Sequence, residues 1–150
     1  MAIYLTEEFR ATADDAGIDV QILVDEFSWW KEDEAREYLS PWFGKDSAYT
    51  APRVNGEQWV LRHCHLPPSH TAALARWQKI LSRKGRKTSD RVLVYVKRPD
   101  GDFLLIFVLD EPGAHQIAKM ENLADRQLMQ AMSAAAEEFL AGDHSNCRVA

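Results

Sequence analysis

Two apolar segments on either side of a short polar turn constrain the fold of this 150-residue chain more than any other feature. Arg91–Lys97 (RVLVYVK) and Phe103–Leu109 (FLLIFVL) are rich in the branched and aromatic side chains that favour β-strands. Pro99 and Gly101 lie between them and supply the fixed and positive φ values that a chain reversal needs. The second segment is apolar on both faces, so it should lie in the middle of a covered sheet.

Apolar periodicity predicts the elements around this hairpin. Asp19 is a candidate N-cap for an amphipathic helix that extends to about residue 36. Trp59–Leu66 alternates like a strand, and a short helix should follow it. A helical tail follows Pro112 and should end at Gly142. Residues 3–9 fit either a strand or the start of a helix, and periodicity does not decide between them.

This order of elements predicts an α+β fold, a compact antiparallel sheet flanked by helices, in a single domain. We expect the domain to cover residues 1–142 and a C-terminal tail to follow at 143–150. No apolar run approaches the roughly 18 residues of a membrane span, and the first residues do not form a secretory signal. Cys64 and Cys147 are too few for a disulfide framework or a zinc site. We therefore expect a cytoplasmic protein with reduced thiols and no membrane association.

The net charge of −5 conceals a strong asymmetry along the chain. Residues 79–91 contain six basic side chains and one acid, for a net charge of +5, so the other 137 residues sum to −10. A concentrated basic segment can bind a polyanion even on an acidic body, because phosphate contacts are local and charges are screened beyond about 10 Å. The alternative is a solvated loop, and charge alone does not distinguish the two.

His63 and His65 are the first candidates for chemistry. They share one face of the predicted strand, roughly 7 Å apart by the strand rise. Histidine is the side chain that titrates near neutral pH, so such a pair can hold and relay a proton. The pair can also bind a metal, although two ligands without a neighbouring carboxylate support this weakly. The competing interpretation is that both rings pack beside Trp59 and Leu61.

Three further polar residues stand where chemistry can use them. Asp90 opens the hairpin and can act as a base, although capping a turn and holding Arg91 is the more ordinary role. Tyr95 lies within the first strand of the hairpin, where its phenol can polarise a 2′-hydroxyl, stack on a base or simply pack. His115 begins the final helical region and either caps the preceding turn or projects into a cleft.

Taken together, the motifs resemble those of the YafO toxin family, related to the RelE/ParE superfamily. Order and spacing are similar from about Ile3 to Phe139. The segments that carry the resemblance are 43–49 (FGKDSAY), 63–66 (HCHL), Ser89-Asp90 with 93–95 (LVY), 104–106 (LLI), 111–118 (EPGAHQIA) and 136–139 (AEEF). The chain departs from the basic character usual in RelE-like toxins, and it has extra residues in the basic segment and after Phe139.

The resemblance implies a type II toxin that is paired with a cognate antitoxin and cleaves mRNA at the ribosome without a metal or cofactor. A base removes the 2′-hydroxyl proton, basic side chains stabilise the phosphate, and an acid protonates the leaving oxygen. The candidates for proton transfer are His63, His65, Tyr95 and His115, with Asp90 as a further candidate base. The candidates for RNA binding are Lys79, Arg83, Lys84, Arg86, Lys87 and Arg91.

Two other functions are compatible with the sequence. The same fold can be a non-catalytic interaction domain that inhibits a protein target or the ribosome, because a fold does not determine an activity. The chain can also be a small-molecule or metal-assisted enzyme that uses His63 and His65. Metal content distinguishes this last function from the other two, and mapping of RNA cleavage distinguishes a nuclease from an interaction domain.

Overall fold

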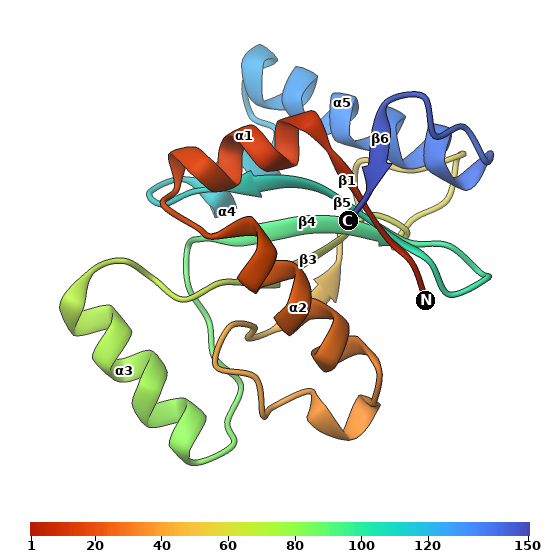
Figure 1. Ribbon diagram of the computed structural model, residues 1–150. Coiled ribbons are helices and arrows are strands. Elements are labelled where there is room, and N and C mark those ends of the chain that lie inside the picture. The colour runs from red at the N-terminus through yellow and green to blue at the C-terminus, as the bar shows by residue number, and fades with distance from the viewer.

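The computed structural model describes residues 1–150 and contains one six-stranded sheet with helices on both faces (Figure 1). The strands lie in the order β2-β3-β4-β5-β1-β6. Every neighbouring pair is antiparallel except β1 and β5, which are parallel. The predicted α+β class and single domain are confirmed. The strands are β1 (Ile3–Thr6), β2 (Asp46–Ala48), β3 (Arg62–His65), β4 (Val92–Lys97), β5 (Phe103–Leu109) and β6 (Cys147–Val149).

The predicted hairpin is confirmed as β4 and β5. Its turn is closed by the backbone amide of Arg98, which donates to the carbonyl of Asp102 at 2.8 Å. β5 lies between β4 and β1, and six of its seven residues are buried, as expected for a strand that is apolar on both faces. The register between β4 and β5 shifts at Val94/Tyr95.

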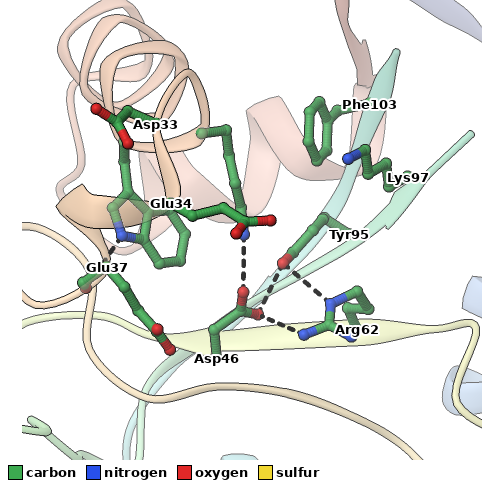
Figure 2. A pocket seen from close by; sticks show the side chains of 10 residues that line it. Asp33, Glu34, Glu37, Asp46, Arg62, Tyr95, Lys97 and Phe103 are labelled. Carbon is green, nitrogen blue, oxygen red and sulfur yellow. Dashed lines mark hydrogen bonds and ion pairs between the residues drawn. The ribbon is translucent and has the colours of Figure 1, made fainter. Parts of the chain in front are cut away.

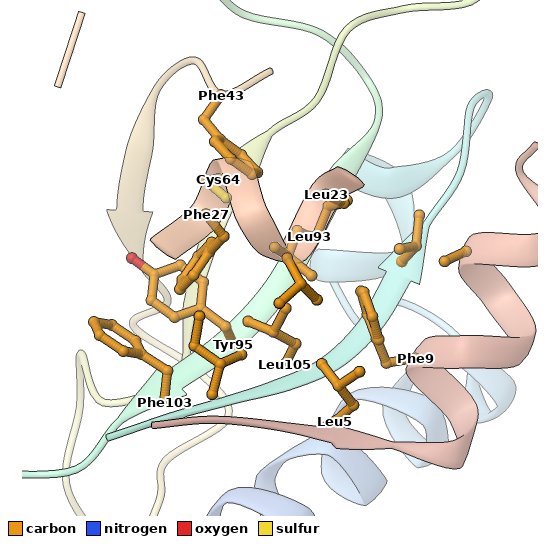
Figure 3. Close-up of a cluster of buried hydrophobic side chains, with 14 of the residues drawn as sticks. Leu5, Phe9, Leu23, Phe27, Phe43, Cys64, Leu93, Tyr95, Phe103 and Leu105 are labelled. Atoms are coloured by element: carbon orange, nitrogen blue, oxygen red, sulfur yellow. The ribbon is translucent and has the colours of Figure 1, made fainter. Parts of the chain in front are cut away.

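Helices α1 (Glu7–Asp15) and α2 (Val20–Lys31) cover one face of the sheet (Figure 1). Both interpretations of the N-terminus are partly right, because β1 leads directly into α1 at Thr6. The Thr6 hydroxyl accepts from the amide of Phe9 at 2.9 Å, and Asp19 caps α2 in the same way. The core on this face includes Leu5, Phe9, Leu23, Phe27, Phe43, Cys64, Leu93, Tyr95, Phe103 and Leu105 (Figure 3).

Helices α4 (Ala114–Ala118) and α5 (Leu123–Leu140) cover the other face. The predicted helical tail is therefore two helices, because Met120 adopts a φ of 53° and Asn122 caps α5 by accepting from Asp125. Side chains of β4 and β5 that alternate with those of the first core pack against α5. This second core includes Val94, Leu104, Ile106, Met129, Met132 and Phe139.

Two other segments differ from the expectation. The strand expected at 59–66 begins only at Arg62, because Trp59 has a φ of 63° and is 64% exposed. Helix α2 ends at Lys31, and a separate 3-10 turn, η1 (Glu34–Arg36), follows it. The residues after 142 include β6, which pairs with β1 at the sheet edge. Helix α3 (Thr71–Ser82) stands apart from the sheet (Figure 1), and no helix is long and apolar enough to cross a membrane.

Candidate functional site

Three histidine rings lie in a row at one end of the sheet, on the face that α4 and α5 cover. His63 and His65 point to the same side of β3, and their ring centroids are 6.0 Å apart. His115, from the start of α4, continues the row at 5.4 Å from His65. At the other end, the ring of Tyr49 stacks on His63 at 4.0 Å. The structure thus brings together three of the residues singled out as proton-transfer candidates, and we call them the histidine row.

Asp90 fixes the orientation of His115. One carboxylate oxygen accepts from Nδ1 of His115 at 2.8 Å and from its backbone amide at 2.9 Å, and the other accepts from the amide of Gly113 at 2.6 Å. Burial opposes ionisation of Asp90, but the hydrogen bonds from both amides outweigh it and lower its pKa. The Asp90 side chain forms no hydrogen bond or ion pair with Arg91. It accepts from the amides of Gly113 and His115 at the start of α4, and its bond to Nδ1 leaves Nε2 of His115 available.

This arrangement follows from the hairpin. Val92 pairs with Leu109, so the residue that precedes β4 and the residues that follow β5 meet at the same end of the sheet. Gly113 then turns the chain into α4 with a φ of 125°, which residues with a side chain rarely adopt. A carboxylate next to an imidazole Nδ1 fixes which ring nitrogen faces outward, as in hydrolase active sites.

His65 is held by the backbone of the segment before β4. Its Nδ1 lies 2.8 Å from the amide nitrogen of Ser89 and 2.7 Å from the Ser89 carbonyl oxygen, so the tautomer decides which of the two it contacts. Burial lowers the pKa of His65 from 6.5 to about 4, and burial also lowers the pKa of His63 to about 4, with the charge of the other histidine adding to it. Both rings are therefore neutral at neutral pH.

Because of these two pKa values, the free energy of unfolding should fall as the pH falls from 6.5 to 4. In this range the unfolded chain binds protons at His63 and His65 while the folded chain does not, so the stability gained above pH 6.5 is lost on acidification. Each histidine contributes a slope of up to about 1.4 kcal/mol per pH unit. Urea titrations across this range should show a slope for His63→Phe that is shallower than that of the wild type by up to about 1.4 kcal/mol per pH unit. An equal slope for the wild type and this variant would contradict the burial of His63 as a neutral ring.

Two basic residues add positive charge beside the row. The charges of Lys45 and Arg86 both lower the pKa of His65, and that of Lys45 also acts on His63. The carbonyl of Lys45 accepts from the amide of His65 at 2.9 Å, next to the last pair of the β2–β3 ladder. Sequence reasoning missed Lys45, although it stands in the FGKDSAY motif that helped to indicate the family.

Four of the six basic side chains in residues 79–91 are exposed. Lys79, Arg83, Lys84 and Arg86 are exposed, whereas Lys87 is completely buried. Gly44 packs against this point so closely that an added Cβ would lie 2.2 Å from the carbonyl oxygen of Lys87. Burial lowers the pKa of the Lys87 ammonium group. Four of the six predicted RNA-binding residues are therefore free to meet a phosphate, while Lys87 is not at the surface.

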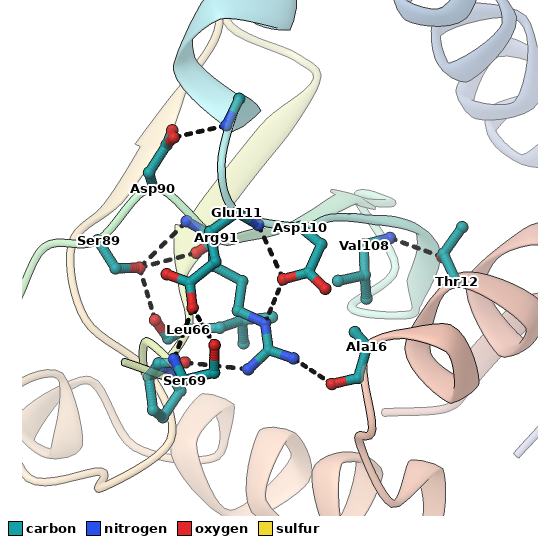
Figure 4. Close-up of polar contacts among 12 residues, drawn as sticks. Thr12, Ala16, Leu66, Ser69, Ser89, Asp90, Arg91, Val108, Asp110 and Glu111 are labelled. Carbon is teal, nitrogen blue, oxygen red and sulfur yellow. Dashed lines mark hydrogen bonds and ion pairs between the residues drawn. The ribbon is translucent and has the colours of Figure 1, made fainter. Parts of the chain in front are cut away.

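Arg91 is the sixth of the predicted RNA-binding residues, and its side chain connects separate parts of the chain (Figure 4). Its side chain is 10% exposed and pairs with Asp110 at 2.8 Å. The guanidinium also donates to the carbonyl of Pro67 at 3.2 Å and to that of Ala16. These contacts join the segment before α3, the end of α1 and the end of β5. Arg91 is placed to stabilise the fold rather than to contact RNA.

Tyr95 lies on the opposite face of the sheet from the histidine row. It is buried, and its hydroxyl donates to Asp46 at 2.7 Å and accepts from Arg62 Nε at 3.2 Å (Figure 2). Asp46 also pairs with Lys31 at 2.7 Å. Burial and the charge of Asp46 raise the pKa of Tyr95 well above its usual value. The structure therefore does not bring Tyr95 together with the histidines.

This second polar cluster lines a cavity of about 450 Å³ between α2, η1 and the sheet. Three acidic side chains stand at its edge: Asp33, Glu34 and Glu37 (Figure 2). Sequence reasoning did not single out Asp46 or Arg62, although the period of two along β3 places Arg62 with Cys64, opposite the two histidines. Across the 150 residues, no group of three or more histidine, cysteine or acidic side chains has a geometry that could hold a metal ion.

Comparison with known proteins agrees with the resemblance in the sequence. A family model described as toxin YafO of a type II toxin–antitoxin system matches residues 28–141. No curated protein and no solved structure matches the chain. The matched range includes β2 to α5, and thus the whole histidine row, Asp90 and the basic segment. Since the match covers most of the chain, the protein belongs to the YafO toxin family of type II toxin–antitoxin systems.

Proposed function

We propose that this toxin is a ribosome-dependent mRNA endoribonuclease and that the histidine row is its active site. The observation that carries the proposal is the pair His65 and His115, with rings 5.4 Å apart and His115 oriented by Asp90. Rings at this separation can both reach one phosphodiester through hydrogen bonds of about 2.8 Å. The neighbouring Lys45 and Arg86 supply the positive charge that a phosphate needs.

The reaction that suits this geometry is an attack by the ribose 2′-oxygen on the adjacent phosphorus. A neutral imidazole, His65 or His63, takes the 2′-hydroxyl proton as the new O2′–P bond forms. His115, in its protonated form paired with Asp90, gives a proton to the 5′-oxygen as the P–O5′ bond breaks. The products are a 2′,3′-cyclic phosphate and a 5′-hydroxyl, and the reaction consumes no net proton.

The low pKa values of His63 and His65 are compatible with this role. A pKa of about 4 makes a ring a weak base in the free protein, because burial and nearby positive charges disfavour the imidazolium form. A bound phosphodiester brings a negative charge to the same place, and an opposite charge within a few ångströms raises the pKa of a histidine again. Substrate binding would thus raise the pKa of this base toward neutral pH, where general bases are most effective.

An acidic protein is poorly suited to bind RNA alone, which supports dependence on the ribosome. Outside residues 79–91 the net charge is −10, so long-range attraction for free RNA should be weak. The exposed basic side chains offer only a local contact with RNA; they are Lys79, Arg83, Lys84 and Arg86. On a translating ribosome the mRNA is already held, and local phosphate contacts are then enough to position it.

Cleavage mapping in a bacterial translation extract tests the proposal. Added toxin should produce new 5′ ends within the coding region of a translated mRNA, and an antibiotic that blocks initiation should prevent them. The same RNA without ribosomes should stay intact. If translation stops while every mRNA stays whole, the protein is instead a non-catalytic inhibitor, and the histidine row has another role.

A further inference from the structure

Trp59 combines an exposed indole with a backbone conformation that a large side chain rarely adopts. The residue is 64% exposed, the highest value among the large apolar side chains of the protein. Its φ of 63° lies in the left-handed region, where a side chain crowds its own backbone. This conformation costs free energy, and an indole in water offsets none of that cost by burial. Trp59 is therefore a candidate for contact with another molecule.

A bulge at the end of the β2–β3 ladder holds Trp59 in this conformation. In a regular antiparallel pair, a residue that forms hydrogen bonds donates to and accepts from the same partner. The amide of Tyr49 instead donates to the carbonyl of Leu61 at 2.8 Å, whereas the carbonyl of Tyr49 accepts from the amide of Trp59 at 3.0 Å. Regular alternation would direct Trp59 to the face of Leu61, which is completely buried. The bulge leaves the indole in solvent, and bulges commonly redirect a side chain beside an active site.

The loop that carries the indole is fixed to the body of the protein. Residues 49–61 lie beside α5 in Figure 1. The hydroxyl of Ser133 on α5 donates to the carbonyl of Arg53 at 2.6 Å. One turn further along the same helix, the carboxylate of Glu137 accepts from the amide of Asn55 at 2.9 Å. The loop is therefore ordered before any ligand binds, so that binding on the indole does not have to offset the entropy of ordering it.

Trp59 adjoins one end of the histidine row. Tyr49, whose carbonyl accepts from the amide of Trp59, also stacks its ring on His63 at 4.0 Å. With the contacts within the row, the order along this part of the sheet is His115, His65, His63, Tyr49 and Trp59. The ring of Tyr49 is buried, so Trp59 supplies the exposed aromatic surface at this end of the row.

An exposed indole in this position suits an unpaired nucleobase. Bases of single-stranded RNA stack on aromatic side chains, and such stacking needs no positive charge on the protein. Outside residues 79–91 the net charge is −10, so contacts other than ion pairs must contribute to holding the RNA. Of the other exposed aromatic residues, Trp29 belongs to α2, which covers the opposite face of the sheet.

We propose that Trp59 stacks on a nucleobase of the mRNA on the 5′ side of the cleaved bond. The direction follows from the proton transfers proposed above. The 2′-hydroxyl that gives its proton to His63 or His65 belongs to the upstream nucleotide, whereas His115 at the far end of the row serves the 5′-oxygen of the downstream one. Trp59 adjoins the His63 end, so the base that it holds belongs to the upstream RNA. The inference rests on the proposed nuclease function and adds a substrate-positioning residue to it.

Cleavage of mRNA on purified, programmed ribosomes by full-length variants tests this assignment. Trp59→Ala should lower kcat/KM by about 5- to 150-fold, the change that corresponds to the loss of one base–aromatic stack. Trp59→Phe keeps an aromatic ring and should retain more of the activity than Trp59→Ala. Trp29→Ala is the matched control, because it removes a 38% exposed indole from α2, and it should cleave at the wild-type rate. Urea denaturation shows whether each variant is folded.

The base preference of the wild-type protein gives an answer that depends on no variant. A purine offers a larger stacking surface than a pyrimidine, so a purine in the two positions 5′ of a mapped cleavage site should raise the rate, and Trp59→Ala should lose this difference. Equal rates with either base in the wild type would overturn the proposal, as would wild-type kcat/KM in a folded Trp59→Ala protein or an equal loss in Trp29→Ala. These outcomes leave the nuclease function intact, whereas a wild-type protein that cleaves no mRNA would reject that function and the stacking role together.

Discussion

Replacing His115 by alanine should lower the rate of mRNA cleavage by about 10²- to 10⁴-fold, the usual contribution of a general acid or base. The side chain of His115 is 56% exposed, so its removal should change the thermal midpoint only slightly. The backbone amides of residues 113 and 115 still donate to Asp90, so the start of α4 stays capped. Cleavage of a translated mRNA in an extract, quantified by primer extension, gives the rate.

His70→Ala is the matched control for this variant. His70 is also an exposed histidine, but it lies just before α3, outside the row, and its side chain makes no capping hydrogen bond. The His70→Ala protein should cleave mRNA at the wild-type rate. The cleavage rate of Asp90→Asn should lie between those of His115→Ala and His70→Ala, because an amide still accepts hydrogen bonds but no longer stabilises a protonated His115. Full activity of a folded His115→Ala protein would remove His115 from the mechanism.

Replacing Phe27 by alanine should lower the free energy of unfolding by about 3–5 kcal/mol, the largest effect on stability that we expect from one substitution. Phe27 is completely buried at the centre of the core in Figure 3. Its ring meets those of Trp30, Phe43, Tyr95 and Phe103 edge-on, with centroids 5.2–5.9 Å apart. Alanine leaves a cavity among four rigid rings that cannot collapse to fill it.

Urea denaturation measures this loss, and two other variants define its cause. Phe27→Leu fills most of the space and should cost clearly less than alanine. Ile22→Ala lies on the exposed side of the same helix and should change stability by less than about 0.5 kcal/mol. A loss as large for Ile22→Ala as for Phe27→Ala would contradict the assignment of the effect to the buried Phe27 ring, because alanine keeps the helix propensity of α2 at both positions.

Local patterns were enough to predict the hairpin and the pairing of His63 with His65. β4 and β5 adjoin in the chain, so their pairing needs only a turn, and alternation along β3 decides which side chains share a face. The contact between Asp90 and His115 is also a consequence of the hairpin, although reading it required knowing that Val92 pairs with Leu109. These features depend on geometry between neighbouring segments of the chain, so the sequence predicts them well.

The parts that sequence did not reveal depend on contacts between distant segments. Tyr95 lies across the sheet from the histidines because Arg62 pairs with it, and nothing in either strand alone specifies that register. Lys87 looks like its exposed neighbours in the sequence, yet the approach of Gly44 and Trp77 buries it. The structural role of Arg91 likewise depends on contacts with residues that are distant in the chain, namely Ala16, Pro67 and Asp110.

The chemical ends of the cleaved mRNA test the central claim most directly. Attack by the 2′-oxygen, with the histidine row moving the protons, predicts a 2′,3′-cyclic phosphate on the upstream fragment and a 5′-hydroxyl on the downstream one. The downstream fragment should then be labelled by polynucleotide kinase without prior phosphatase treatment, and a 2′-O-methyl group at the cleaved ribose should prevent cleavage. A 3′-hydroxyl together with a 5′-phosphate, or cleavage that tolerates the 2′-O-methyl group, would contradict the mechanism proposed for His63, His65 and His115.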